Sequence, residues 1–322
     1  MVTGGAGFIG SCLIRQLNDK GIGDIIVVDN IACTEKWKNL VNKNYAEYIH
    51  KNDLEAELDR LSDSVERVIH MGACSATTEN DFDYLYRNNV AYSKMLYDFC
   101  AWNDIPFIYA SSAATYGDGK LGFCDDAYSL KPLNGYGYSK HLFDLWVKAI
   151  DPETDRKPPQ QVGLKFFNVF GPNEYFKGPM ASMAFHGHKQ IRDSGKIRLF
   201  KSYLSGVPDG EQSRDFIYVK DVCKIIWHFC QSPNLSGVFN VGTGQARSFN
   251  DLARALFSAM GEAVDIEYID MPEHLREKYQ YYTCAETEKL RRLGKYDEAF
   301  YTLEDSVKDY VNTYLADDYA SY

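Results

Sequence analysis

The sequence has no apolar run as long as the ~18 residues that a membrane-spanning helix requires, and it has no excess of positive charge. Its 322 residues include 35 lysines and arginines against 45 aspartates and glutamates, which gives a formal net charge of -10. A broad basic face for nucleic acid is therefore not expected. The segment Met1–Gly5 has neither the basic nor the apolar region of a signal peptide. We expect a cytoplasmic protein that binds no nucleic acid and no membrane.

The eight cysteines are scattered along the chain. They form no Cys-x-x-Cys pair and no cluster with histidine at the spacing of a zinc site, so we expect no metal. Without a sign of export, we expect reduced and mostly buried thiols rather than disulfides. The composition, 45% hydrophobic and 25% charged, is that of a globular protein, and the length suits two domains of ~100–200 residues.

Short apolar runs alternate with helical segments in the first half of the chain. The runs are continuous rather than alternating, as in strands that are buried on both faces. This order predicts βαβ units and a doubly wound parallel sheet. The expected strands are Ile25–Asp29, Val65–His70, Pro106–Ala110 and Val162–Phe170, and the expected helices are Phe8–Lys20, Asp83–Trp102 and Tyr136–Ile150.

Glycines recur at the start of the chain as Gly4-x-x-Gly7-x-x-Gly10, directly before the first predicted helix. Glycine allows a tight turn and lets the backbone approach a pyrophosphate at the helix N-terminus. Asp29 ends the next strand, where an acid binds the adenosine ribose. A structural glycine turn is the weaker alternative. The pattern favours a Rossmann-type fold whose first strand, Met1–Thr3, is either very short or preceded by residues upstream of Met1.

The residues after Asp29 bear on the choice between NADP and NAD. Asn30 does not repel a ribose 2′-phosphate as a second acid would, and Lys36 or Lys51 could bind it. For each lysine taken alone, a solvated surface charge is the favoured interpretation. We therefore expect NADP, with NAD as the alternative.

The second half of the chain is richer in loops, glycine and proline. Its helical segment Val219–Cys230 and the strand-like segment Gly237–Val241 are expected to return to the sheet. We predict a dinucleotide-binding domain over 1–170, to which 215–242 returns, and a smaller α+β substrate-binding lobe over 171–322. Such a lobe would close a cleft at the carboxyl ends of the strands.

Tyr136 and Lys140 are spaced i, i+4 and share one helix face. An ammonium beside the phenol should lower a pKa that is normally ~10. The tyrosine could then take a proton from a substrate hydroxyl while hydride passes to a nicotinamide. Ser112, which follows a predicted strand, can donate a hydrogen bond to the reacting oxygen.

Taken together, these motifs resemble the extended short-chain dehydrogenase/reductase superfamily over essentially the whole chain. Where 4,6-dehydratases of that superfamily carry an Asp-Glu pair after the serine, this chain has Ala113 and Ala114, which favours an epimerase. Four further segments are similar to the ADP-L-glycero-D-manno-heptose 6-epimerase family. They are Gly72–Glu79, Leu133–Lys140, Gly171–His186 and Lys278–Gln280.

That resemblance implies an NADP-dependent isomerase that oxidises C6 of ADP-D-glycero-D-manno-heptose transiently and returns hydride to the opposite face. It implies Tyr136 and Lys177 as acid/base groups, with Ser112 assisting and Lys140 holding the cofactor. The implied cofactor contacts are Gly4, Gly7, Phe8, Ile9, Gly10, Asp29, Asn30, Lys36, Lys51, Met71, Gly72, Ala73, Cys74, Ser75, Asn88, Lys140, Val169 and Lys177. The implied substrate contacts are Ser112, Asn168, Pro179, His186, Phe200, Arg214 and Tyr279.

The resemblance also implies a homo-oligomer, pentameric in the family's known form, that serves lipopolysaccharide core assembly. Two alternatives remain open at this stage: another nucleotide-sugar epimerase, such as a UDP-hexose 4-epimerase, and a non-enzymatic dinucleotide sensor. Retention of Ser112, Tyr136 and Lys140 disfavours the sensor. Without the family resemblance, a lysine that binds phosphate or faces solvent is the preferred interpretation of Lys177. The net charge of -10 would then conceal a locally basic cleft.

Overall fold

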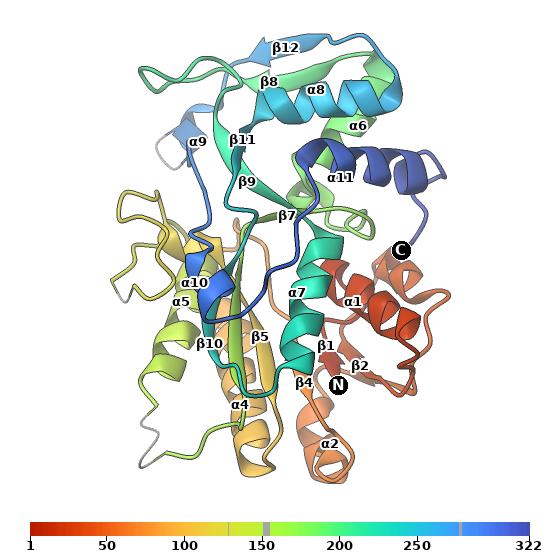
Figure 1. The fold of residues 1–322 in the computed structure, drawn as a ribbon, viewed down its shortest axis with the longest axis vertical. Coiled ribbons are helices and arrows are strands. Elements are labelled where there is room, and N and C mark those ends of the chain that lie inside the picture. The colour runs from red at the N-terminus through yellow and green to blue at the C-terminus, as the bar shows by residue number, and fades with distance from the viewer. Residues whose placement is uncertain (128, 151–154, 277–278) are drawn as a thin grey trace.

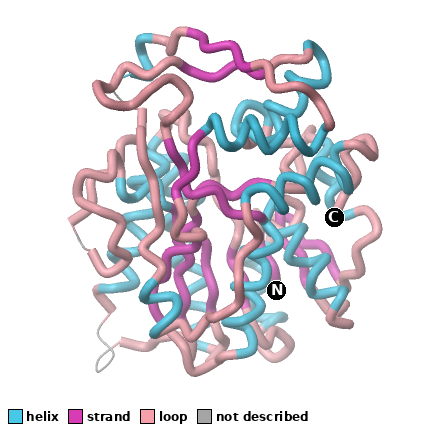
Figure 2. Tube along the Cα trace, turned by 45° about the horizontal axis from the view of Figure 1, so that its top comes forward, coloured by secondary structure: helices cyan, strands magenta, loops and turns pink. Residues whose placement is uncertain are grey.

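The computed structural model describes residues 1–127, 129–150, 155–276 and 279–322. Its centre is a seven-stranded parallel sheet in the order β10-β6-β5-β4-β1-β2-β3, with helices on both sides (Figures 1 and 2). This confirms the Rossmann-type doubly wound sheet. The strands are β1 (Val2–Thr3), β2 (Ile26–Asp29), β3 (Glu47–His50), β4 (Val68–His70), β5 (Phe107–Ser112), β6 (Gln161–Phe166) and β10 (Gly237–Val241).

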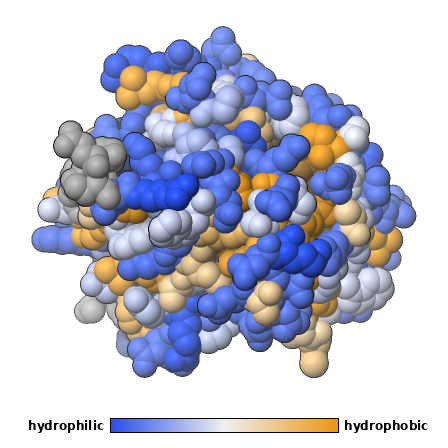
Figure 3. Space-filling view, turned by 90° about the horizontal axis from the view of Figure 1, so that it is seen from below, coloured by the Kyte–Doolittle hydropathy of each residue, from blue (hydrophilic) through white to orange (hydrophobic). Residues whose placement is uncertain are grey.

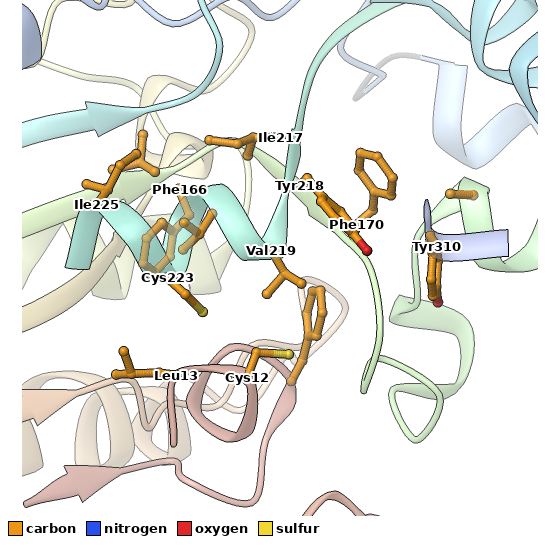
Figure 4. Close-up of a cluster of buried hydrophobic side chains, with 14 of the residues drawn as sticks. Cys12, Leu13, Phe166, Phe170, Ile217, Tyr218, Val219, Cys223, Ile225 and Tyr310 are labelled. Atoms are coloured by element: carbon orange, nitrogen blue, oxygen red, sulfur yellow. The ribbon is translucent and has the colours of Figure 1, made fainter. Parts of the chain in front are cut away.

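Alternate residues of the strands supply two separate hydrophobic layers, because successive side chains of a strand point to opposite faces. Val27 of β2 packs in the first layer with α1 (Phe8–Asp19) and α7 (Val219–Gln231). Its neighbour Val28 packs in the second layer, which includes α2 (Leu54–Leu61), α4 (Tyr92–Trp102) and α5 (Gly135–Lys148). Figure 4 shows Cys12 of α1 beside Val219 and Cys223 of α7 in the first layer.

The expected strand Val162–Phe170 is wrong in one respect, since it is two strands that belong to different sheets. β6 ends at Phe166, and β7 (Asn168–Phe170) pairs in parallel with β9 (Ser213–Tyr218). The Phe167 N–H donates to the carbonyl of Val241 on β10, and the Val169 N–H donates to the carbonyl of Phe167 at 2.9 Å. The partner strand β9 lies far away in sequence, so the apolar pattern alone did not reveal the break.

The second half of the chain builds a smaller layer at one end of the molecule (Figure 1). β9 joins β7 and β11 (Ala246–Ser248) in a three-stranded sheet, and β8 (Ile197–Phe200) pairs in parallel with β12 (Ile266–Ile269). The helices α6 (Met183–Ser194), α8 (Phe249–Met260) and α11 (Leu303–Asp309) accompany this layer, and α9 (Glu273–Arg276) follows β12. α10 (Glu288–Arg292) instead lies beside β10 of the main sheet. The remaining short helices are α3 (Phe82–Leu85), η1 (Glu35–Leu40), η2 (Tyr86–Ala91), η3 (Ala113–Tyr116), η4 (Gly178–Met180) and η5 (Tyr310–Leu315).

All eight cysteines are free thiols, but the expectation that most are buried is wrong. Only Cys12, Cys100 and Cys223 are buried, whereas Cys33 and Cys124 are exposed. Cys33 lies in a surface turn before η1, and Cys124 lies in the irregular segment between η3 and α5. Cysteine packs readily in a core, but its side chain is small enough to be tolerated on loops.

Figure 3, which views the molecule from below, shows a largely hydrophilic face with apolar residues in smaller groups. Across the described ranges, no helix combines the length and the apolar character needed to cross a bilayer.

Candidate active site

The glycine-rich loop between β1 and α1 has no room for a side chain at two of its positions. Gly4 has a φ of 67°, and a Cβ atom there would lie 2.6 Å from the backbone nitrogen of Gly72. A Cβ atom on Gly10 would overlap the carbonyl oxygen of Gly4. Gly7 is the N-cap of α1, so the first-turn N–H groups of Phe8 and Ile9 lie at this loop. A helix N-terminus held this close to the sheet is suited to a pyrophosphate.

Asp29 lies where the sequence places it, buried at the carboxyl end of β2. One carboxylate oxygen accepts the Ala6 N–H of the glycine loop at 2.8 Å. The other accepts the Asn30 N–H at 2.6 Å and pairs with Lys36 Nζ at 2.7 Å. Asp29, Asn30 and Lys36 therefore form one group, and the lysine offsets the charge of the acid.

Lys51 and Asn88, two more predicted cofactor residues, are joined by a hydrogen bond from the lysine ammonium to the amide oxygen. Asn88 lies in η2, a π-helical turn between α3 and α4, and such turns are frequent at functional sites. Burial lowers the pKa of Lys51, and the charge of Lys36 lowers it further while Asp29 raises it. These groups therefore share one electrostatic environment at the carboxyl ends of β2 and β3.

The segment Met71–Ser75 follows β4 and is fixed from both sides. The Gly72 N–H donates to Thr3 Oγ1 at 3.3 Å, and the Cys74 N–H donates to Asn89 Oδ1 at 2.8 Å. Asn89 also donates to the Cys74 carbonyl at 2.9 Å and to Ser139 Oγ on α5 at 3.0 Å. Met71, Gly72 and Cys74 are half-buried, whereas Ala73 and Ser75 are exposed. The segment thus bridges the glycine loop and the helix that carries Tyr136.

Ser112 and Tyr136 come from different elements and meet. Ser112 ends β5, and its Oγ accepts the Ala114 N–H at 3.1 Å. Tyr136 lies in the first turn of α5, whose N-cap Asn134 accepts the Gly137 N–H at 2.8 Å. Burial raises the pKa of Tyr136, and a hydrogen bond with Ser112 opposes that effect. We expected Lys140 to lower the pKa of Tyr136. That expectation is wrong for the protein alone, because burial raises this pKa.

Lys140 lies one helical turn after Tyr136 and is 4% exposed. Its ammonium donates to the Ala110 carbonyl of β5 at 2.9 Å. Burial lowers its pKa to about 8, against the raising effect of Asp144 and Cys74. The lysine is therefore held against the strand that carries Ser112.

Lys177 lies beside the N-terminus of α1, with its Nζ 5.3 Å from the ring centroid of Phe8. Burial lowers its pKa, and the charge of Glu174 opposes that effect. Glu174, which is fully buried, accepts the Gly171 N–H at 3.1 Å, and Ser182 donates to it through both its N–H and its hydroxyl. The loop that carries Lys177 is thus anchored at one internal carboxylate.

Arg214 and Tyr279 form the centre of the predicted substrate side. The Arg214 guanidinium is buried and lies 5.2 Å from the Tyr279 ring and 5.5 Å from the Phe249 ring. Burial lowers the pKa of Arg214, and the hydrogen bond with Tyr279 opposes that effect. Phe200, at the end of β8, packs edge-on to Tyr279 at 6.4 Å. A shielded arginine between aromatic rings suits a phosphate group.

The remaining predicted residues are more spread out. Asn168, exposed on β7, accepts a hydrogen bond from Thr283 at 3.3 Å, and its neighbour Val169 is half-buried. Pro179 is exposed in η4. His186 on α6 lines a surface cavity with Lys189 and Arg198, and Arg214 is not among the residues that line it. Lys278, which belongs to one of the matching segments, lies outside the described residues.

Three buried polar residues around the site were missed by the sequence analysis: Glu174, Asp144 and Lys165. Lys165 interrupts an apolar run that was expected to be buried on both faces. A lone charge in such a strand predicts a buried partner, so this signal was available. Asp144, at i+4 from Lys140, could have been found by the same helical spacing. Glu174 lies within the matching segment Gly171–His186, but no spacing in the sequence indicates that it is buried.

The glycine loop, the acid at the end of β2 and the Ser112–Tyr136–Lys140 group together define a nicotinamide-dependent enzyme of the short-chain dehydrogenase type. Residues 1–242 match the model of the NAD dependent epimerase/dehydratase family. An ADP-L-glycero-D-manno-heptose-6-epimerase of Nitratidesulfovibrio vulgaris is 53% identical over 98% of both chains, and one of Fusobacterium nucleatum is 48% identical over 98% of both. The crystal structure of the Helicobacter pylori enzyme of that name has a TM-score of 0.81 and 30% identity, covering 97% of this chain and 94% of its own.

The chain belongs to the NAD dependent epimerase/dehydratase family and, within it, to the ADP-L-glycero-D-manno-heptose-6-epimerases. Because epimerases are isomerases, the expected enzyme class is confirmed. The family description also supports a nicotinamide cofactor. Within the described part of the chain, no group of three or more His, Cys, Asp or Glu side chains could hold a metal ion.

Proposed function

We propose that this chain converts ADP-D-glycero-D-manno-heptose to ADP-L-glycero-D-manno-heptose by transient oxidation at C6 of the heptose. The observation that carries the proposal is the meeting of Tyr136 and Ser112 one turn from Lys140, at the edge of the sheet where the glycine loop also lies. The names of the relatives support the substrate. The proposed setting is the bacterial cytoplasm, in assembly of the lipopolysaccharide core.

The residues around the glycine loop fit a nicotinamide dinucleotide, because Gly4 and Gly10 leave no space for a Cβ atom and Asp29 lies where a ribose binds. When bound, the nicotinamide supplies the hydride acceptor and donor that the reaction requires. Tyr136 takes the proton of the C6 hydroxyl and returns it, and Ser112 donates a hydrogen bond to the same oxygen. Lys140 holds the cofactor and adds positive charge one helical turn from the phenol.

Lys177 is proposed as the acid/base group for the second stereoisomer. A second group is useful because the ketone must receive hydride on either face. The position of Lys177 beside Phe8 also suits a contact with the cofactor. One lysine can both transfer the proton and contact the cofactor. Arg214, next to Tyr279, is proposed to bind the diphosphate of the substrate.

NADP is the proposed cofactor, with NAD as the alternative. Lys36 pairs with Asp29 at 2.7 Å and thereby offsets the charge that would repel a 2′-phosphate. Lys51 adds a second positive charge to the same environment. We further propose a homo-oligomer, with a pentamer as the expected form, which analytical ultracentrifugation of the purified protein would test.

The decisive experiment is incubation of the protein with ADP-D-glycero-D-manno-heptose, followed by NMR at H6 and identification of the cofactor released on denaturation. We expect the L-glycero isomer and NADP. Absence of any isomer would sink the proposal. A parallel panel of UDP-hexoses tests the alternative of a hexose 4-epimerase, since turnover of those sugars alone would transfer the assignment to that class.

Two variants test the proposed roles in the same assay. Tyr136→Phe removes the phenol that moves the proton, so we expect turnover to fall by about 10²–10⁴-fold with the cofactor still bound. Lys177→Met should reduce turnover of both isomers, and a change confined to cofactor affinity would instead assign Lys177 to phosphate binding. Turnover of Tyr136→Phe at the unmodified rate would refute the role of Tyr136.

A further inference from the structure

Two oppositely charged side chains are buried next to the candidate active site. Lys165 on β6 and Asp144 on α5 are 1% and 2% exposed, and the atoms Nζ and Oδ2 lie 2.6 Å apart. Asp144 also accepts hydrogen bonds from Ser111 Oγ at 2.7 Å and from the Tyr109 hydroxyl at 3.1 Å. Lys165 donates a second hydrogen bond, to Thr115 Oγ1, at 2.9 Å. Both charges therefore have partners inside the protein.

A buried ion pair is a weak source of stability, because desolvation of the two charges offsets their attraction. Val162, Leu164 and Phe166 of β6 are buried and apolar but point to the opposite face of the sheet, whereas Lys165 points toward α5. An apolar pair of similar volume would fill the space of Lys165 and Asp144 at comparable stability. Stability alone therefore does not explain why the ion pair is present. Its position beside the candidate catalytic residues suggests a functional reason.

Asp144 shares a face of α5 with the two candidate catalytic residues of that helix. It lies one helical turn after Lys140 and two turns after Tyr136. Its contacts with Tyr109 and Ser111 fasten this face of the helix to β5. The spacing of α5 from β5 is thus set by a hydrogen-bonded carboxylate rather than by apolar contact alone.

Lys165 reaches the other part of the site through one hydroxyl group. Thr115 Oγ1 accepts a hydrogen bond from Lys165 and donates one to the carbonyl of Ser112 at 2.8 Å. Ser112 itself stands at the junction of β5 and η3. The pair therefore contacts both elements whose side chains meet at the site, α5 on one side and the end of β5 on the other.

The carboxylate of Asp144 also acts on Lys140 through its charge. Burial lowers the pKa of Lys140 to about 8, and Asp144 is the largest of the influences that raise it. Cys74, in the segment after β4, also raises the pKa of Lys140. From β4, the neutral imidazole of His70 faces Lys140, whose charge helps to lower the His70 pKa. Tyr136 lies one turn away on α5, and Lys165 lies on the far side of Asp144, with its Nζ 2.6 Å from Asp144 Oδ2.

We propose that Asp144 and Lys165 are positioning residues, which hold Ser112 and Tyr136 at hydrogen-bond distance and place a carboxylate one helical turn from Lys140. The inference deepens the proposed function, on which it rests, because it concerns the groups that move the proton. Neither residue touches substrate or cofactor in this scheme. Their effect is exerted through α5, β5 and η3.

The test variant is the double exchange Asp144→Asn with Lys165→Met, which leaves no buried charge unpaired and so retains the fold. The matched control is Lys220→Met with Asp309→Asn, an ion pair with the same 2.6 Å separation that joins α7 to α11. Lys140 is titrated directly by 13C NMR of its Cε in lysine-labelled protein. Its signal is assigned by its loss in Lys140→Arg.

We expect Lys140 to titrate near pH 8 in the native and control proteins and at lower pH in the double variant. The kcat of the double variant should fall by about tenfold at pH 8.5 and recover toward pH 6.5, with KM changed less. Thr115→Val is a milder second variant. We expect its kcat to fall while the pKa of Lys140 stays unchanged.

The outcomes separate the two proposals. Because the titration needs no substrate, a native protein that fails to epimerise the ADP-heptose counts against the proposed function alone. An unshifted Lys140 titration in the double variant overturns the electrostatic part of the inference. Native kcat in Thr115→Val overturns the positioning part, even if the double variant does not fold.

Discussion

At the scale of single residues, His70 illustrates how a hydrogen-bond network fixes a protonation state. Ser93 donates to the Asn89 carbonyl at 2.8 Å, so its oxygen accepts from His70 Nε2, which lies 2.9 Å away. Nδ1 is therefore unprotonated and accepts from Thr3 Oγ1 at 2.6 Å. Burial lowers the pKa of His70 to about 3. A neutral imidazole thus connects β1 to β4 directly below the glycine loop.

This network makes a prediction about stability and pH. Between pH 3 and pH 6.5 the unfolded chain binds a proton at His70 that the folded protein does not, so the stabilisation present above pH 6.5 is lost as the pH falls. Between pH 7.5 and pH 5 we expect this to cost about 2 kcal/mol. Urea unfolding of the native protein and of His70→Gln measures it. If the free energy of unfolding changed with pH in the same way in both proteins, the pH dependence could not be assigned to His70.

The ion pair between Lys36 and Asp29 makes a second prediction at this scale. Lys36→Ala leaves the Asp29 carboxylate uncompensated, so a ribose 2′-phosphate meets repulsion where it had a partner. Loss of a charge-assisted contact of about 1.5–3 kcal/mol should weaken NADP binding by about 10–100-fold and leave NAD binding little changed. Calorimetric titration with both cofactors measures this.

The control for that measurement is Lys38→Ala. Lys38 belongs to the same η1 segment but pairs with the exposed Glu35 at 2.9 Å. We expect its affinity for both cofactors to match that of the native protein. Equal losses of NADP and NAD affinity in Lys36→Ala would show that the lysine supports the loop rather than the phosphate.

The residue scale also shows where sequence reasoning ends. The position of Asp29 follows from its spacing to the glycines, and the structure has it at the end of β2. Its pairing with Lys36 does not follow, because the sequence leaves the conformation of residues 30–36 open. The pKa of Tyr136 was expected to be low from its spacing to Lys140, but burial raises it. Spacing predicts which groups are neighbours, and it does not predict how far each is desolvated.

At the scale of elements, local signals predicted the helices well. α1, α5 and α7 lie within two residues of their expected ends, because the apolar periodicity of a helix is a property of the segment itself. The expected helix Asp83–Trp102 is three consecutive helical pieces with the π turn η2 in the middle. The split between β6 and β7 was missed, since it depends on pairing with β10 and β9. Long-range pairing is absent from any short window of sequence.

The contact between α1 and its preceding loop yields a prediction at this scale. Gly10→Ala places a methyl group against the Gly4 carbonyl, so α1 must move away from the loop. We expect a loss of about 2–3 kcal/mol of unfolding free energy and at least a tenfold loss of nicotinamide affinity, because the helix N-terminus shifts. Chemical denaturation and calorimetry measure the two effects.

Gly261→Ala is the appropriate control for that substitution. Gly261 ends α8 with a φ of 71°, and the space that a Cβ atom would take there is open. The substitution should cost about 1 kcal/mol of backbone strain and leave cofactor affinity as it was. If Gly10→Ala behaved like this control, close packing of the loop would not be what the glycine provides.

At the scale of the whole molecule, the first hydrophobic layer is shared by both halves of the chain. One cluster of buried residues extends from α1 and α7 to α8 and α11. Figure 4 shows Phe170, Tyr218 and Tyr310 in this cluster, with ring centroids of Phe170 and Tyr218 5.5 Å apart. The two halves therefore form one packed body, in which the loop carrying Lys177 lies between them.

Asn173 joins three distant parts of the chain at that loop. Its side chain donates to Ser11 Oγ on α1 at 2.9 Å and accepts the Tyr322 N–H at 2.9 Å. Its carbonyl accepts from Asn39, which also donates to the Ala6 carbonyl of the glycine loop at 3.1 Å. Asn173 has a φ of 72°, a conformation that asparagine tolerates better than most residues. The residue thus connects the Lys177 loop, the glycine loop and segment 320–322.

Replacing Asn173 by glycine tests this connection, because glycine keeps the backbone conformation and removes only the side-chain hydrogen bonds. With the side chain 1% exposed, we expect a loss of about 2–4 kcal/mol of unfolding free energy. Amide hydrogen exchange should also show loss of protection in 320–322 before global unfolding. Asn42→Gly is the control, since Asn42 has a φ of 62° but is exposed. A urea midpoint of Asn173→Gly equal to that of Asn42→Gly would mean that the two halves are held together by the hydrophobic cluster alone.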